Sequence, residues 1–187
     1  MNLILDHVSV LVNSVDATAK LFADSGIPVG KKEAFKDIGT EEIYIGNQEF
    51  QALLLLQAAI GDGPYRRALE KRGTGIHHVA ISSDDFDASN EKLFGLGWFV
   101  HPHSLKKYRK GATVFYVRPG VHTIVELITN KEPPCSPRLI QEVLIKTDPG
   151  KEDFIHGIGI TGLIGSSTEE PYIIMNGTKF IICLLKL

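Results

Sequence analysis

The sequence has little of what marks several large protein classes. Of its 187 residues only two are cysteines, Cys135 and Cys183, and they lie far apart without a CxxC spacing. This usage argues against a disulfide framework or a cysteine-based metal site, so two free thiols are expected. The formal net charge is −2, without the basic excess of a typical nucleic-acid-binding protein. We therefore expect no nucleic-acid partner.

Long apolar runs are missing as well. No uncharged apolar stretch approaches the roughly 18 residues that a bilayer-spanning helix needs. The stretch MNLILDHVSV has no basic leader and reaches Asp6 after a few apolar residues. We expect a cytosolic protein without a membrane partner. With 43% hydrophobic and 22% charged residues, the composition is that of an ordinary globular protein.

Several catalytic signatures are also missing. The sequence contains no GxSxG, P-loop or HExxH motif. GIGITG, residues 157–162, formally matches GxGxxG, but the residues after it make a poor helix, so a dinucleotide site is not expected. His101 and His103 flank a proline, which indicates a loop rather than a pair of metal ligands.

The sequence does contain an internal repeat. Residues 5–26, LDHVSVLVNSVDATAKLFADSG, resemble residues 76–97, IHHVAISSDDFDASNEKLFGLG, at an offset of 71. Each copy has the pattern of a strand, a helix-capping turn and an amphipathic helix that ends at glycine. Segments 41–57 and 112–128 then have the pattern of hairpins. Each half is predicted to be one strand, one helix and about three further strands.

Two such βαβββ modules in tandem predict an α+β fold, in which a cupped mixed sheet carries its helices on the outside. We place module 1 at about residues 3–57 and module 2 at about 75–130, within one domain over 1–130. The linking segment 58–75 should hold a short helix whose basic residues form a solvated face. Residues 131–187 are too few for a third copy, so they are expected to form a C-terminal extension of edge strands or a lid.

Strand alternation selects the candidate site residues. Successive side chains point to opposite faces, so the adjacent His77 and His78 are not expected to face one site. The repeat leaves His7 and His78 toward the cup and His77 on the packing side or at a strand end. Glu126 lies in the apolar run IVELI, where a carboxylate is costly unless it is paired or ligated. His7, His78 and Glu126 are therefore candidate ligands of a divalent metal with open positions.

The stretches LDHVSV, LEKRGTGIHHVAI, DDFDA and IVELI resemble the vicinal oxygen chelate superfamily of glyoxalases, bleomycin resistance proteins and dioxygenases. Within it they are most similar to the methylmalonyl-CoA epimerases. The resemblance covers about residues 3–130 and implies the paired βαβββ cup. It also implies a divalent ion (Co, Mn, Zn, Ni or Fe) held by His7, His78 and Glu126. Members commonly form dimers, so a homodimer is expected.

The resemblance further implies a fourth ligand, a Gln or Glu on the last strand of the first module. Aligning Tyr44 with Tyr116 gives an offset of 72, which places this position at Leu54. Leucine cannot bind a metal, and Gln51 and Gln57 each lie three residues away, on the opposite strand face. We therefore expect three protein ligands and a Leu54 that lines the cup.

An epimerase of this kind removes an acidic C–H proton next to a thioester carbonyl and returns it on the other face. The metal stabilises the enolate, and carboxylates on the two sides act as base and acid. Glu126 can supply one of these groups. Asp37 and Glu42, near the first hairpin, are candidates for the other, with Asp37 as the first choice.

Substrate contacts are expected from the cup and from one basic loop. Leu54 and Tyr116 are expected to line the cup. Lys106, Lys107 and Arg109 belong to the loop KKYRKG, which can bind the phosphates of an acyl-CoA. The favoured function is a metal-dependent epimerase or isomerase acting on a small acyl-CoA such as methylmalonyl-CoA.

Two other functions fit the same residues. Two histidines and one glutamate also describe the facial triad of non-haem Fe(II) oxygenases. Extradiol dioxygenases of the superfamily resemble this pattern, including a tyrosine before the glutamate, as Tyr116 lies before Glu126. Alternatively, a cup lined by Leu54 suits a non-enzymatic small-molecule-binding protein of the resistance type, with its histidines merely hydrogen-bonded.

Overall fold

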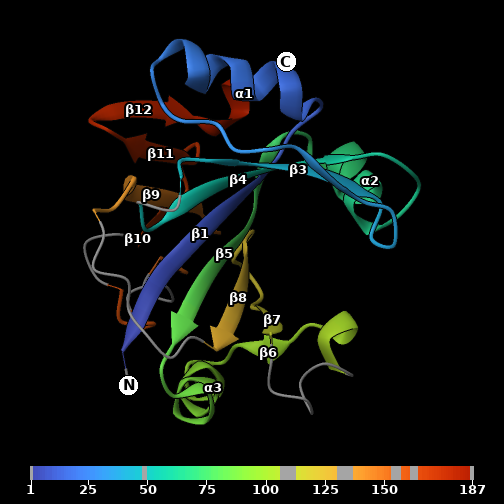
Figure 1. The fold of residues 1–187 in the computed structure, drawn as a ribbon. Helices are drawn as coiled ribbons and strands as arrows, with labels where there is room; N and C mark the ends of the chain where they lie inside the picture. The colour runs from blue at the N-terminus through green and yellow to red at the C-terminus, as the bar shows by residue number, and fades with distance from the viewer. Residues whose placement is uncertain are drawn as a thin grey trace.

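The fold is seen in a computed structural model, which describes residues 2–47, 50–105, 113–129, 137–152, 157–160 and 164–185. These residues form an eight-stranded sheet and a four-stranded sheet, accompanied by three α-helices (Figure 1). None of these helices is both long and apolar enough to span a bilayer.

The eight-stranded sheet consists of two modules of the same construction. The first module contains β1 (Leu3–Leu11), α1 (Val15–Asp24), β2 (Glu33–Phe35), β3 (Thr40–Ile45) and β4 (Leu53–Ala59). The second contains β5 (Gly75–Ser83), α3 (Phe86–Gly95), β6 (Phe99–Val100), β7 (Thr113–Val117) and β8 (Ile124–Thr129), with a 3-10 turn, η1 (Pro102–Ser104), after β6. Helix α2 (Pro64–Arg72) links the modules. The predicted α+β fold of paired βαβββ modules is confirmed.

The strand order β2-β3-β4-β1-β5-β8-β7-β6 has a pseudo-twofold relation at its centre. There β1 and β5 pair antiparallel, and each has a parallel neighbour from its own module, β4 or β8. The two modules therefore meet only through their first strands within this sheet. Residues related by the repeat lie close together along that central pair.

Both module helices begin and end as the repeat predicts. The Ser14 side chain accepts the Ala17 N–H at the start of α1, and the Asp85 side chain accepts the Ala88 N–H at the start of α3. Each cap satisfies a backbone donor that the first helical turn leaves unpaired. After each helix a glycine, at positions 26 and 97, has a positive φ near +75°, which favours residues without a Cβ.

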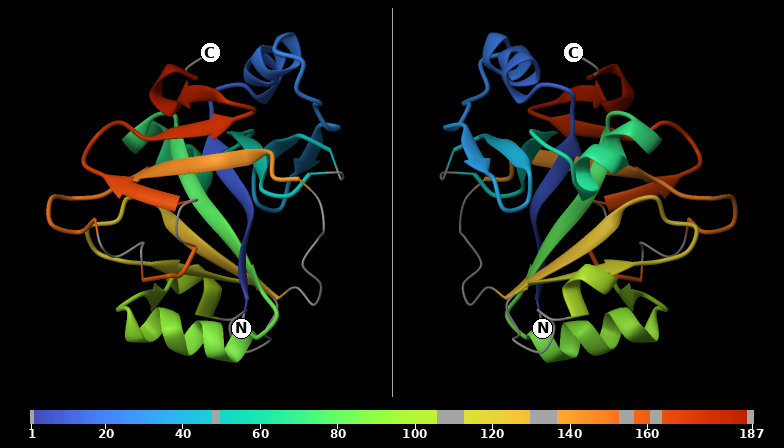
Figure 2. Two further views of the ribbon diagram at one scale, coloured as in Figure 1. Left: turned by 90° about the vertical axis from the view of Figure 1, so that its left-hand side faces the viewer. Right: turned by 90° about the vertical axis from the view of Figure 1, so that its right-hand side faces the viewer.

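The C-terminal segment forms a separate sheet, whereas edge strands or a lid were expected. Its strands are β9 (Ile140–Lys146), β10 (Ile164–Ser167), β11 (Tyr172–Met175) and β12 (Thr178–Ile181), in the order β10-β9-β11-β12, followed by η2 (Ile182–Leu184). Figure 2 shows this sheet in front of β1 and β5, between α1 and α3. Phe180 of β12 contacts Phe22 of α1, with ring centroids 4.9 Å apart.

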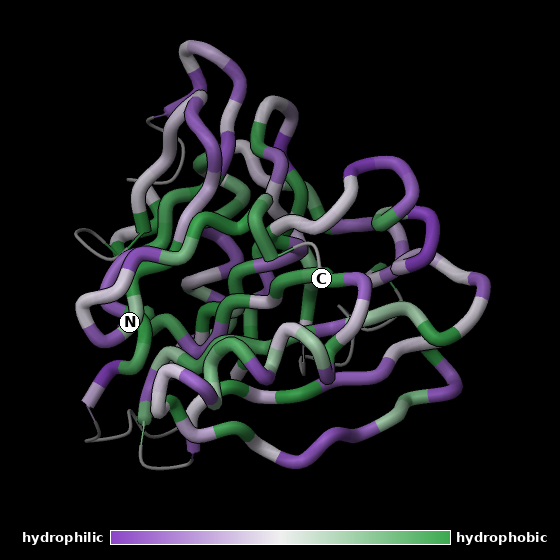
Figure 3. The backbone as a smooth tube through the Cα atoms, turned by 90° about the horizontal axis from the view of Figure 1, so that it is seen from above, coloured by the Kyte–Doolittle hydropathy of each residue, from purple (hydrophilic) through white to green (hydrophobic). Residues whose placement is uncertain are grey.

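One hydrophobic core joins both sheets. Val8 of β1 and Leu54 of β4 belong to the same buried cluster as Val143 of β9 and Ile173 of β11. Figure 3 shows hydrophobic segments gathered in the central strands and hydrophilic ones in peripheral loops. The second sheet therefore covers the outer face of the first, and the inner face remains for the cup.

Tyr116 lies on that outer face, under α3. It is fully buried, and its hydroxyl donates a hydrogen bond of 2.6 Å to Oδ1 of Asn90. The ring also lies 6.1 Å from the Phe94 ring, centroid to centroid. The predicted role of Tyr116 in lining the cup is therefore wrong.

We expect Tyr116→Phe to lower the free energy of unfolding by about 1–2 kcal/mol, because it removes a donor from a buried hydrogen bond. Urea denaturation measures this change. Tyr172→Phe is the matched control, because the Tyr172 hydroxyl bonds Glu142 nearer the surface, and it should cost less than about 0.5 kcal/mol. Equal losses in the two variants would contradict the placement of Tyr116.

Candidate metal centre

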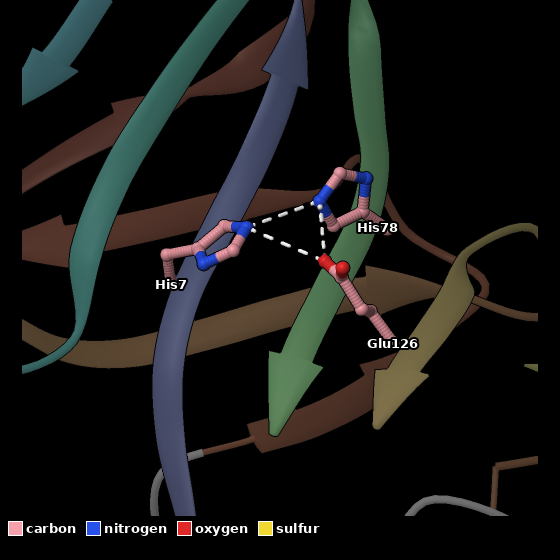
Figure 4. A group of neighbouring side chains, drawn as sticks. All are labelled: His7, His78 and Glu126. Carbon is pink, nitrogen blue, oxygen red and sulfur yellow. Dashed lines mark hydrogen bonds and ion pairs between the residues drawn. The ribbon is translucent and has the colours of Figure 1, made fainter. Parts of the chain in front are cut away.

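Three side chains from different strands converge on one point of the inner face. His7 comes from β1, His78 from β5 and Glu126 from β8 (Figure 4). Nε2 of His7 lies 3.1 Å from Nε2 of His78. Oε2 of Glu126 lies 3.2 Å from Nε2 of His78 and 3.6 Å from Nε2 of His7. All three residues are buried, so the polar groups face one another and not solvent.

The spacing of these atoms fits a bound metal ion. A triangle with these sides has a centre roughly 2 Å from each corner, which matches the length of Zn–N and Zn–O bonds. Two imidazole nitrogens and one carboxylate oxygen suit divalent transition metals. One ion would satisfy the three groups together. Among the described residues, this group meets the spacing that a metal site of at least three ligands requires.

Two β-bulges shape the site. In the pairing of β1 with β5, the register shifts between Leu5 and His7 and again between Ser9 and Val10. The first shift leaves Asp6 as an extra residue on β1, and the second leaves His77 as an extra residue on β5. A bulge interrupts the alternation of side chains.

His77 consequently lies beside His78. Their Nδ1 atoms are 2.9 Å apart, and their ring centroids are 5.2 Å apart. The expectation that His77 faces away from the site is therefore wrong. That expectation assumed a regular strand, and no local sequence feature marks the bulge. A comparison with Asp6, its repeat equivalent, is the one signal that was available.

Each of the two histidine ligands has an orienting contact from the residue before it. Oδ1 of Asp6 lies 2.7 Å from Nδ1 of His7. This contact holds the proton on Nδ1 and leaves the Nε2 lone pair for the shared point. His77 occupies the equivalent position beside His78. When Nε2 of His78 faces the shared point as a ligand, its Nδ1–H donates to Nδ1 of His77.

Burial keeps His77 and His78 neutral. It is the main cause that lowers the pKa of His77 to about 3, and the neighbouring His78 lowers it further. Burial also lowers the pKa of His78, although its hydrogen bond to Glu126 acts in the opposite direction. Neutral imidazoles are the form that binds metals. Both rings are therefore in the binding-competent state at neutral pH.

Leu54 does not line the cup. In the parallel pairing of β1 with β4, His7 lies beside Leu53 and Val8 lies beside Leu54. Neighbours in a pairing point to the same face. Leu54 is fully buried in the core together with Val8, so its predicted contact with a substrate is wrong.

The position equivalent to Glu126 is Leu55. Glu126 pairs with Ala80 of β5, and Leu55 pairs with Ser9 of β1. Ala80 and Ser9 are repeat equivalents at the same offset as His78 and His7. The fourth ligand position of the family therefore holds a leucine, as expected, but one residue later than expected. Leu55 is 3% exposed.

The alignment of two aromatic residues caused this error. Tyr44 pairs with Leu55, and Phe115 pairs with Glu126. Phe115, and not Tyr116, is therefore the equivalent of Tyr44. The rings of Tyr44 and Phe115 contact His7 and His78, at centroid distances of 5.8 Å and 5.5 Å.

Gln57 also faces the cup, contrary to expectation. Its Oε1 accepts a hydrogen bond of 2.5 Å from the Ser9 hydroxyl. Its Nε2 donates to Oε1 of Glu42 at 2.7 Å, and the Thr40 hydroxyl donates to the same oxygen at 2.9 Å. This network fixes the Glu42 carboxylate in the wall of the first module. Strand parity counted from β1 would have found both residues.

A cavity of about 1060 Å³ opens beside the three-residue group. Its inner wall includes direct neighbours of the group: His77, Phe115 and Ile124. Ile124 pairs with His78, as Phe115 does with Glu126. The cavity is large enough for an extended small-molecule ligand.

The outer part of this cavity is rich in charged groups. Arg67 and Lys71 of α2 are exposed, as expected for the linking helix, and they also line the cavity. Asp37 is exposed in the turn between β2 and β3, where it too lines the cavity. His101 and His103 line the same cavity and stack on each other, outside the three-residue group. The basic-loop residues Lys106, Lys107 and Arg109 lie outside the described residues.

Comparison with known proteins agrees with this geometry. The family model of the Glyoxalase/Bleomycin resistance protein/Dioxygenase superfamily matches residues 6–116. A comparison with curated proteins found no match.

Similar solved structures include methylmalonyl-CoA epimerase from Mycobacterium tuberculosis, which is 22% identical with a TM-score of 0.52, over 70% of this chain and 89% of that one. A hypothetical protein from Bacillus halodurans C-125 is 20% identical with a TM-score of 0.53, over 72% and 99% of the two chains. Streptomyces coelicolor methylmalonyl-CoA epimerase in complex with 2-nitronate-propionyl-CoA is 22% identical with a TM-score of 0.50, over 69% and 98%. At these identities the likeness shows a shared fold.

We expect Leu55→Gln to raise the affinity for Co²⁺ or Zn²⁺ by about tenfold, because it adds an oxygen ligand to an open site. Isothermal titration calorimetry measures the change. Leu54→Gln is the matched control, and it should leave metal affinity unimproved while lowering stability by about 2–5 kcal/mol, because it buries an unpaired amide. A gain in affinity from Leu54→Gln and none from Leu55→Gln would refute the assigned register.

We expect His77→Phe to weaken Co²⁺ binding by about 10–100-fold, because Nδ1 of His78 loses its acceptor. His77→Asp repeats the Asp6–His7 pair of the first module, so it should keep the affinity within about threefold of wild type. Titration calorimetry and the Co²⁺ absorption spectrum report both effects. If His77→Phe binds Co²⁺ as wild type does, His77 has no orienting role.

Proposed function

The chain belongs to the glyoxalase/bleomycin resistance protein/dioxygenase superfamily, and from this we propose that it is a metal-dependent enzyme of the epimerase or isomerase type. Its proposed substrate is a small acyl-CoA such as methylmalonyl-CoA. The observation that carries the proposal is the convergence of His7, His78 and Glu126 beside a large cavity. The methylmalonyl-CoA epimerases among the similar structures support the choice of reaction and substrate class.

Three residues of this chain would hold the ion. His7 and His78 would bind it through Nε2, and Glu126 through Oε2, with Co, Mn, Zn, Ni and Fe as suitable divalent metals. When bound, such an ion polarises a substrate carbonyl and stabilises the negative charge that develops on its oxygen. Leu55 supplies no ligand at the fourth family position.

Epimerisation also needs two groups that move a proton on opposite sides of the reacting carbon. Glu126 turns Oε2 toward the two imidazoles, so Oε1 is the atom that would hold or move a proton. We assign the second role to Glu42, because Gln57 and Thr40 fix its carboxylate in the facing module. Asp37, the first choice from sequence, is exposed at the wall of the larger cavity and remains the competing candidate.

The charged outer part of the cavity supports an acyl-CoA substrate. Arg67 and Lys71 of α2 lie on its wall, and Lys36 lies near the turn that carries Asp37. Exposed cations bind phosphates through charge-assisted hydrogen bonds. The proposed arrangement puts the acyl group at the three-residue group and the phosphates at α2.

A second candidate is an Fe(II) extradiol-type dioxygenase. The observation that favours it is the three-ligand set itself, since two histidines and one carboxylate form the facial triad of such enzymes. The tyrosine that strengthened this candidate, Tyr116, bonds Asn90 under α3 and does not face the cup. The epimerase is therefore the better-supported candidate.

Metal-loaded protein with methylmalonyl-CoA in deuterated buffer should exchange the C2 proton, which proton NMR follows directly. We expect Glu126→Gln and Glu42→Gln each to slow the exchange by about 10²-fold or more, because each removes a proton-transfer group. Asp37→Asn is the matched control and should stay within about threefold of wild type. A large loss from Asp37→Asn with none from Glu42→Gln would reverse the assignment of the second group.

Two further outcomes bear on the function as a whole. Exchange no faster than in Glu126→Gln would refute the epimerase, and oxygen uptake with a catechol by the Fe²⁺-loaded protein would establish the dioxygenase instead. Protein that retains no stoichiometric ion after loading, yet binds an apolar ligand in the cup, would be a binding protein of the resistance type.

A further inference from the structure

A second cavity, of about 540 Å³, lies where the C-terminal segment meets the eight-stranded sheet. The module side contributes the end of α2 and the start of β5, with Arg72, Thr74 and Ile76 on the wall. The C-terminal side contributes Lys146 at the end of β9 and Cys183 in η2. Its volume falls within the range of about 300–1,000 Å³ that is usual for small-molecule sites.

Thr74 brings an unpaired hydroxyl to this cavity. The residue is 8% exposed, and its Oγ1 has no hydrogen-bond partner in the part of the chain that the structure describes. A buried hydroxyl without a partner is costly, which favours an occupant that accepts or donates a hydrogen bond. The hydroxyl of Thr74 can donate to a ligand oxygen.

Arg72 adds positive charge with spare donors. Its Nη1 lies 3.4 Å from the backbone carbonyl of His122, and across the described ranges no carboxylate pairs with it. An arginine side chain has five N–H donors in a planar fork that fits a carboxylate. On the opposite side of the cavity, Lys146 lies 3.6 Å from Glu170, so its charge is largely balanced.

The remaining wall is apolar. Leu11 at the end of β1, Ala68 of α2, Ile76 of β5 and Pro171 line the cavity together with the polar groups. An inorganic anion would leave these surfaces without contact. A ligand with a compact hydrocarbon body would cover them and gain from the burial of apolar area.

We propose that this second cavity binds a small organic acid, whose carboxylate pairs with Arg72 and the Thr74 hydroxyl while its hydrocarbon body packs on the apolar wall. The site is distinct from the metal centre, although His77 and Arg72 line both cavities. The proposal does not depend on the proposed function.

The test is titration calorimetry of the full chain in EDTA, with benzoate as the probe, so that a metal at the three-residue group has no part in the result. We expect benzoate to bind with a dissociation constant of about 1 mM or tighter. Benzamide, its uncharged isostere, and inorganic phosphate should each bind at least about tenfold more weakly. Benzamide or phosphate binding as tightly as benzoate would overturn the proposal.

Thr74→Val is the specific variant, because it removes the hydroxyl and keeps the shape. It should weaken benzoate binding at least about fivefold and raise the melting temperature of the ligand-free protein by roughly 2–4 °C, since an unpaired buried group is lost. Thr18→Val is the control, because the Thr18 hydroxyl in α1 is also buried and unpaired in the described structure but lies outside this cavity. It should raise the melting temperature and leave benzoate affinity unchanged, and equal weakening by both variants would refute the site.

A second measurement places the ligand in the cavity without altering the wall. Cys183 lines this cavity and is a free thiol of intermediate exposure. In Cys135→Ser protein, saturating benzoate should slow alkylation of Cys183 by iodoacetamide at least about fivefold, because the occupant blocks access. An unchanged alkylation rate at saturation would show that benzoate binds elsewhere.

Discussion

The antiparallel pairing of β1 with β5 is the contact on which the rest of the molecule depends. It relates the two modules by a pseudo-twofold and brings His7 and His78 together, with Nε2 atoms 3.1 Å apart. The parallel pairing of β5 with β8 then adds Glu126. Backbone hydrogen bonds along rigid strands thus hold the three groups, which gives more precise placement than loops would.

Burial makes this arrangement expensive without a partner for its polar atoms. A carboxylate and two imidazoles inside an apolar sheet lose their hydration, and burial lowers the pKa values of His77 and His78. Asp6 and His77 each contact one imidazole at Nδ1, so both Nε2 atoms are directed to the shared point. The fold accepts this cost on its inner face, while the C-terminal sheet, α1 and α3 bury hydrocarbon on the outer face.

The differences between sequence and structure have one origin. Counting alternate residues along a strand assumes a regular ladder, and the bulges at Asp6 and His77 break that assumption. The same counting, applied with an offset of 72 in place of 71, moved the fourth family position to Leu54 and gave Tyr116 the role that belongs to Phe115. A shift of one residue exchanges the two faces of a strand.

The sequence by itself determined the two βαβββ modules, the caps of their helices and the group His7, His78 and Glu126, because these follow from local periodicity and an internal repeat. Only the tertiary structure decided that His77 supports His78, that Leu55 occupies the fourth position, and that the C-terminal strands close a second cavity. Those features arise from pairing and packing between segments far apart in the chain. No local pattern records where such segments meet.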